Sequence, residues 1–233
     1  MNYRIILRDT FRLFRESKLL WILGVISFFS EVIFRGSIYS IGNPPVPCIA
    51  YPLFFISFYF SFVANCSLIY SANQIVSEQK PTYSEAWRFS KTKLRRILWL
   101  YFLSIPLVIF AIFLVGIVLL SEISTSLTWL MDVLVTLLLG SVFTLSICTI
   151  VSHNLEAGLA LWTGLSIVVN NFFHIVILNS IFLILRLAVN IAVGNSLLGV
   201  FFIVPLTVTM TLAYRVFITK GSYPALSNIQ PTA

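Results

Sequence analysis

Charged side chains inside apolar stretches are the first residues in this sequence that could carry chemistry. Four of them are expected in the outer half of a membrane: Glu31, Arg35, Asp132 and Arg186. A charge at the centre of a membrane helix costs roughly 3 kcal/mol on insertion scales, so one that is retained often serves a substrate or ion site. These four could form one polar pocket. The sequence favours the simpler alternative, in which they reach the headgroups and pair structurally.

A second group of polar residues, Asn170, Asn171 and His174, is expected at the inner mouth of a later apolar stretch. A histidine there could sense pH or relay a proton. We favour a role in capping or orienting a helix. His153 and Glu156 are metal-ligand types three residues apart, but two ligands do not make a site. We therefore expect no metal and no cofactor.

Basic residues recur at helical spacing in two further segments. Residues 3–18 place arginines on one face and Tyr3, Ile6, Leu7, Phe11 and Phe14 on the other, which predicts a basic amphipathic helix on the inner leaflet or packed on the chain's own spans. The residues expected to contact anionic lipid headgroups in the two segments are Arg4, Arg8, Arg12, Arg15, Arg88, Lys91 and Arg95.

The second of these helices is predicted to start at Thr82. Thr82 and Glu85 match the capping box, in which each side chain accepts a free backbone N–H of the other residue. Its less polar face is expected to carry Tyr83, Ala86, Trp87, Ser90 and Leu94. A third such helix, without basic residues, is expected from about Asn154.

Six long apolar stretches must position these residues. Hydrophobic residues make up 59% of the 233 residues and charged residues 10%, which excludes a soluble domain. We predict an all-α, polytopic membrane bundle that forms one integral membrane domain over residues 1–233. Residues 1–18 form an interfacial helix, 219–233 a short tail, and the six transmembrane helices cover 19–41, 49–73, 97–120, 127–151, 172–193 and 196–218.

The basic residues are sorted to one side of these stretches. They cluster before the first span, between the second and third, and after the last, whereas the loops at 42–48, 121–126 and 194–195 contain no Lys or Arg. The positive-inside rule then puts both termini in the cytoplasm. Each interfacial helix precedes a pair of spans, so a threefold internal repeat is also expected.

The sequence resembles a family of uncharacterised bacterial integral membrane proteins related to the membrane domain that accompanies some glycerophosphodiester phosphodiesterases. The matching segments are Thr10 to Arg15 leading into Leu19-Leu20-Trp21, and Pro81 to Trp87 ahead of a basic run. The resemblance implies a multi-pass protein of the bacterial inner membrane. Nothing in the chain could form the phosphodiesterase domain, so that activity is not implied.

The function classes narrow accordingly. The sequence contains no phosphate-binding Gly-rich loop, no nucleophile elbow and no His-Glu-x-x-His, so no enzyme is expected. The net charge is +7, and the basic residues flank the apolar stretches. This placement indicates that the chain's partner is the anionic lipid headgroups at the cytoplasmic face and not nucleic acid. A scaffold or subunit with a membrane protein partner, or a homodimer, is the first hypothesis. A small permease or lipid-handling transporter is the second.

Overall fold

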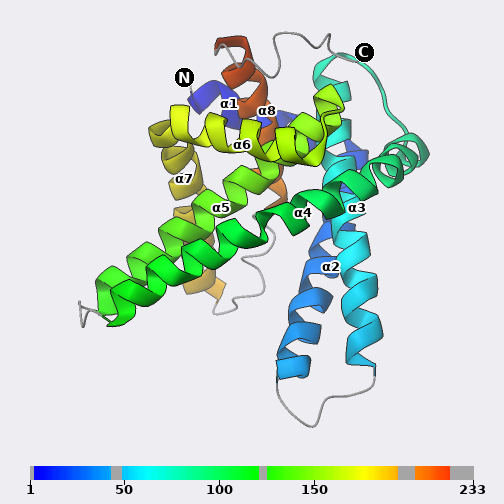
Figure 1. Ribbon diagram of the computed structural model, residues 1–233. Coiled ribbons are helices and arrows are strands. Elements are labelled where there is room, and N and C mark those ends of the chain that lie inside the picture. The colour runs from blue at the N-terminus through cyan, green and yellow to red at the C-terminus, as the bar shows by residue number, and fades with distance from the viewer. Residues whose placement is uncertain (1–2, 43–48, 121–124, 194–202, 221–233) are drawn as a thin grey trace. The chain divides into compact units, whose positions relative to one another are not determined.

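The computed structural model describes residues 3–42, 49–120, 125–193 and 203–220 (Figure 1). These residues are almost entirely helical. The helices are α1 (Tyr3–Glu16), α2 (Lys18–Gly42), α3 (Ala50–Val76), α4 (Tyr83–Leu120), α5 (Thr125–His153), α6 (Ala157–Asn170), α7 (Phe172–Val193) and α8 (Ile203–Lys220).

Each predicted apolar stretch overlaps a helix, and residues 196–202 of the last stretch lie outside the described residues. The overlap does not give the number of membrane crossings. By length and composition, α3 and the segment Tyr83–Ala111 of α4 could each cross a membrane. Two pairs bent at a short break, α1 with α2 and α6 with α7, raise the number to four if each pair is one span. For the residues that the structure describes, an all-helical fold with two to four candidate spans is therefore supported. The six-span count and the threefold repeat stay predictions.

The chain folds into two compact units. The first contains Met1–Leu94 and Ser180–Arg215, and the second contains Arg95–Asn179 and Val216–Ala233. The division into two units does not test whether residues 1–233 form one integral membrane domain, so the single domain stays a prediction.

In the first unit, α2 and α3 lie side by side as an antiparallel pair (Figure 1). The Ser27 hydroxyl donates to Asn65 Oδ1 at 3.1 Å between them. Further along α3, the hydroxyl oxygens of Ser67 and Ser90 lie 2.8 Å apart and share a hydrogen bond. Polar groups that leave water need such partners, so these bonds join the start of α4 to α3.

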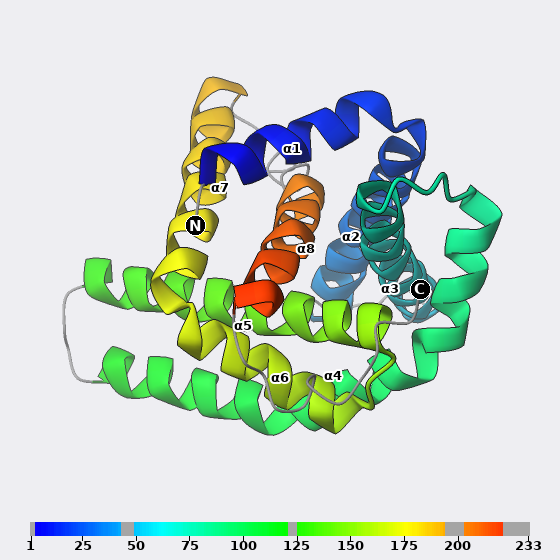
Figure 2. The ribbon, with the colours of Figure 1, turned by 90° about the horizontal axis from the view of Figure 1, so that it is seen from above.

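In the second unit, α6 runs along α5 (Figure 2). Gly164 on α6 lies so close to α5 that an added Cβ would be 2.9 Å from the Val142 carbonyl oxygen and 3.0 Å from the Ser146 nitrogen. The absence of a side chain at Gly164 is what allows this approach. Cys66 in α3 and Cys148 in α5 are both buried.

The helix starts and bends have local causes. Ser17 separates α1 from α2, and its hydroxyl accepts the Leu20 N–H at 3.4 Å, as a residue that caps the start of a helix does. The axes of Tyr3–Glu16 and Lys18–Phe34 meet at 96°. Asn171 separates α6 from α7, and the axes of Ala157–Asn170 and Phe172–Leu185 meet at 88°. Both short helices therefore turn sharply into a long apolar helix.

Candidate functional site

The four charged residues of the predicted outer pocket lie on three helices. Glu31 and Arg35 are in α2, Asp132 is in α5 and Arg186 is in α7. Their side chains lie outside the described residues, as does Cys48. The shared pocket, and the transporter hypothesis that needs it, stay predictions.

The predicted inner-mouth cluster occupies the bend between α6 and α7. Asn171 follows the last turn of α6, and both its backbone N–H and its side-chain amide donate to the Ile167 carbonyl at 3.0 Å. His174 contacts Phe217, with ring centroids 6.5 Å apart, and Asn170 is exposed. Asn171 thus terminates one helix at the point where the next begins. The structure places these residues at a helix joint.

The four arginines of α1 form one exposed face, which we call the basic face of α1: Arg4, Arg8, Arg12 and Arg15. Arg8 lies 3.4 Å from Asp9, and Arg12 lies 3.4 Å from Glu16. Within the described part of the chain, the side chains of Arg4 and Arg15 have no hydrogen bond or ion pair. The basic face is therefore available to an anionic surface.

The opposite face of α1 is packed into the protein. Ile6, Leu13 and Phe14 are buried there. Thr10 donates to the Ile6 carbonyl at 2.9 Å, and its oxygen lies 3.0 Å from that of Thr209 on α8. A hydroxyl has one proton to give, so Thr209 must be the donor in the second bond. On this face, α1 therefore packs on its own chain, as one of the two interpretations of the sequence expects.

Phe11 differs from the other large residues of the apolar face predicted for α1. It is 55% exposed, whereas Ile6 and Phe14 are buried. Phe11 is seven residues after Arg4 and four before Arg15, and both intervals return to the same side of an α-helix. Its place in the basic face follows from that spacing.

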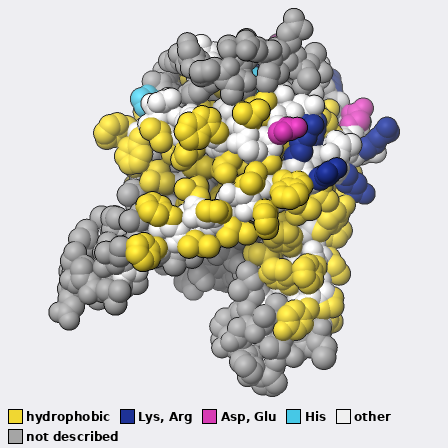
Figure 3. All heavy atoms as spheres, in the orientation of Figure 1, with side chains coloured by type: hydrophobic (Ala, Val, Ile, Leu, Met, Phe, Trp, Pro, Cys, Tyr) yellow, Lys and Arg dark blue, Asp and Glu magenta, His cyan; other side chains and the backbone are white. Residues whose placement is uncertain are grey.

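The start of α4 presents a second basic surface. The predicted capping box is confirmed: the Thr82 N–H donates to Glu85 Oε2 at 2.8 Å, and the Glu85 N–H donates to Thr82 Oγ1 at 3.3 Å. Arg88 and Lys91 are exposed, as is Arg95 at the beginning of the second unit. On the face shown in Figure 3, dark blue side chains gather where α4 begins.

The less polar face predicted for this segment divides into two. Ala86 and Ser90 are buried against α3. Tyr83 and Trp87 instead stack on each other, with ring centroids 5.5 Å apart, and border an open surface groove. The groove was not predicted as a unit, although Tyr83, Trp87 and Lys91 follow one another every four positions, and that spacing could have revealed it.

Arg96 has a role that the sequence did not reveal. Its guanidinium donates to both the backbone carbonyl and the side-chain oxygen of Asn154, in the connection between α5 and α6. Asn154 has a φ of 55°, in the left-handed region that asparagine tolerates better than most residues. Burial lowers the pKa of the neighbouring His153, which lies beyond the predicted span 127–151, and this favours its neutral form.

Within the described ranges, no group of three or more His, Cys, Asp or Glu could hold a metal ion. Comparison with protein-family models, characterised proteins and solved structures gives no match for this chain. The resemblance to the phosphodiesterase-associated membrane proteins therefore stays a prediction, and the basic face of α1 together with the start of α4 is the candidate site.

Proposed function

We propose that this chain is a non-enzymatic component of the bacterial inner membrane, a scaffold or partner subunit held by basic helical faces against the anionic cytoplasmic leaflet. The proposal includes several membrane passes and cytoplasmic termini. It assigns no catalytic residue.

The observation that carries the proposal is that one face of α1 is buried and the other is exposed and basic. One face is occupied by contacts within the chain, including the Thr10 and Thr209 hydroxyls 3.0 Å apart. The other face carries four exposed arginines and Phe11. Each basic residue near an anionic membrane contributes about 1 kcal/mol of attraction. A helix fixed on one side and cationic on the other is suited to docking.

Removing the charges of α1 tests the lipid part of the proposal. We expect the quadruple variant Arg4→Gln, Arg8→Gln, Arg12→Gln and Arg15→Gln to retain less phosphatidylglycerol relative to phosphatidylethanolamine than the wild-type chain after purification in mild detergent. Mass spectrometry of the extracted lipids gives the ratio. An unchanged ratio would contradict attachment through this face.

Photo-crosslinking tests the partner part. Benzoylphenylalanine at the exposed position Phe11 should give a discrete protein adduct in living cells, whereas the same group at buried Phe14 should not. Adducts with lipid alone at Phe11 would contradict a partner at this face. Reporter fusions at the two ends of the chain test the orientation, and opposite locations would contradict it.

A further inference from the structure

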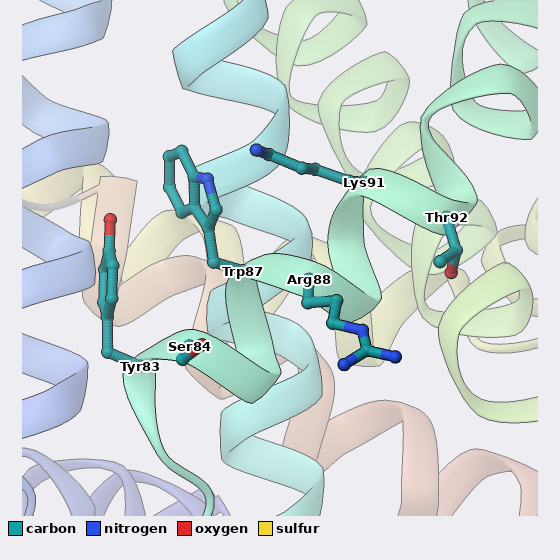
Figure 4. Close-up of a pocket in the computed structure, with 6 residues that line it drawn as sticks. All are labelled: Tyr83, Ser84, Trp87, Arg88, Lys91 and Thr92. Carbon is teal, nitrogen blue, oxygen red and sulfur yellow. The ribbon is translucent and has the colours of Figure 1, made fainter.

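A groove on the first three turns of α4 combines cations with aromatic rings. It has a volume of about 520 Å³ and is open to the outside. Two rows of side chains spaced four residues apart border it, and adjacent rows of this kind lie side by side on a helix. The rows are Tyr83, Trp87, Lys91 and Ser84, Arg88, Thr92 (Figure 4).

The lining favours an anion. It contains the two cationic groups of Arg88 and Lys91, the hydroxyls of three residues and the indole N–H, and no carboxylate. The nearby carboxylate of Glu85 is engaged with the Thr82 N–H at 2.8 Å. Charge-assisted hydrogen bonds from guanidinium and ammonium groups are the strongest that a phosphate can receive from side chains.

The groove is also held in place by the first unit. Trp87 contacts Phe60 on α3, with ring centroids 5.8 Å apart, in addition to its stacking on Tyr83. Behind the aromatic rings, Ser90 is tied to Ser67 on α3 at 2.8 Å. A wall whose position is already fixed loses little conformational entropy when a ligand binds.

We infer that this groove binds the phosphate-bearing headgroup of an anionic glycerophospholipid, with Arg88 and Lys91 at the phosphate and the aromatic row beside it. The inference rests on the proposed function, since that places the start of α4 at a lipid surface. Trp and Tyr are enriched at membrane interfaces, and from Leu98 onward the exposed side chains of α4 become apolar, beginning with Leu98, Trp99 and Phe102. These features favour a lipid over an acidic protein.

The test uses the full chain in detergent and two short-chain probes, dihexanoyl phosphatidylglycerol and dihexanoyl phosphatidylcholine, titrated in native mass spectrometry. We expect one phosphatidylglycerol to bind more tightly than phosphatidylcholine. Arg88→Gln with Lys91→Gln should weaken that binding by about tenfold, because two charge-assisted contacts are lost. Trp87→Leu should weaken it with the charges intact.

The control pair Lys18→Gln and Lys80→Gln removes the same charge from exposed positions outside the groove. Little change in phosphatidylglycerol binding by this pair would support a defined site. A loss of binding equal to that of Arg88→Gln with Lys91→Gln would overturn the inference, because the attraction would then be diffuse. Displacement of the lipid by millimolar inorganic phosphate would also overturn the inference, since a free anion would then be enough to occupy the groove.

The mutated cations are exposed, so we expect unchanged circular dichroism, and the single variants Arg88→Gln and Lys91→Gln provide the same test with smaller changes. The α1 quadruple variant separates the two proposals. It leaves the groove intact, so it should keep the tight phosphatidylglycerol, and loss of that lipid would overturn the assignment to α4. Failure of the α1 prediction with retention of the groove lipid would instead count against the proposed function alone.

Discussion

Helices α1 and α6 have the same length and a similar bend but are held by different interactions. Each has 14 residues, and each meets the following helix at close to a right angle, 96° for α1 and 88° for α6. The exposed face of α1 carries arginines, whereas that of α6 carries Leu159, Trp162 and Val169. Headgroups suit the first face, and the apolar region beneath them suits the second.

The inward faces differ as well. Large side chains and the Thr10 hydroxyl fix α1 to its unit. Small residues fix α6, because Gly164 lets its backbone approach α5 and Arg96 holds the preceding turn. The difference shows that the same bend of nearly 90° can be held by burial of one face of an amphipathic helix or by close packing of two backbones. The second kind should be far less tolerant of added volume.

The largest effect is expected at Gly164. Gly164→Ala places a Cβ against Ser146 Oγ and within 3.0 Å of two backbone atoms of α5, so α6 must move. We expect the free energy of unfolding to fall by about 2 kcal/mol or more, measured by denaturant titration in detergent.

Gly158 offers a matched control within the same helix. A Cβ there meets nothing nearer than Leu103 Cδ1 at 4.0 Å, and the higher helix propensity of alanine favours Gly158→Ala by up to about 1 kcal/mol. The two variants should therefore shift stability in opposite directions. Equal shifts would show that α6 is not held by close packing.

The next effect concerns the turn before α6. Arg96→Gln removes the charged donor to Asn154, and we expect a loss of about 1.5 kcal/mol because hydrogen bonds to charged groups are stronger than neutral ones. A double-mutant cycle with Asn154→Ala measures the coupling. Additive losses would mean that the contact does not stabilise this turn.

For α1, the corresponding bond is weaker. Thr10→Val removes the acceptor of the Thr209 hydroxyl, and we expect a loss of about 1 kcal/mol, typical of a neutral buried hydrogen bond. The pair Thr10→Val and Thr209→Val, compared with each single variant, isolates the interaction. If the double variant is no more stable than the sum of the single losses predicts, the bond does not fix α1.

The smallest effect on stability is expected at the basic face. Arg8→Gln with Arg12→Gln breaks two ion pairs, but the side chains of the second pair are 64% and 53% exposed. Exposed pairs contribute little, so the loss should stay below about 0.5 kcal/mol in detergent without anionic lipid. A thermal shift as large as that of Gly164→Ala would contradict the assignment of these arginines to docking.

The positions of the helices could be predicted because hydropathy and helix breakers act locally. The predicted span 97–120 and the interfacial helix before it form the single helix α4, and the capping box at Thr82 marks its start. Serine at position 17 and asparagine at 171 separate the bent pairs. These signals depend only on a residue and its near neighbours in the chain.

Contacts between helices were harder to predict. Ala160 and Gly164 have the small-residue spacing that allows close packing, but nothing in α6 identifies Val142 and Ser146 as the residues that lie against Gly164. The bond from Arg96 to Asn154 likewise joins residues 58 positions apart. Such pairs depend on how the helices are arranged, which a single sequence does not specify.

The burial of two cysteines makes the protein convenient for site-directed labelling. Cys66 and Cys148 are only 1% and 0% exposed, so maleimide reagents should reach neither in the folded state. With Cys48 replaced by serine, a cysteine introduced at Phe11 or Trp162 would supply a unique reactive thiol. A nitroxide attached at either position would report how deeply α1 or α6 lies in the lipid bilayer.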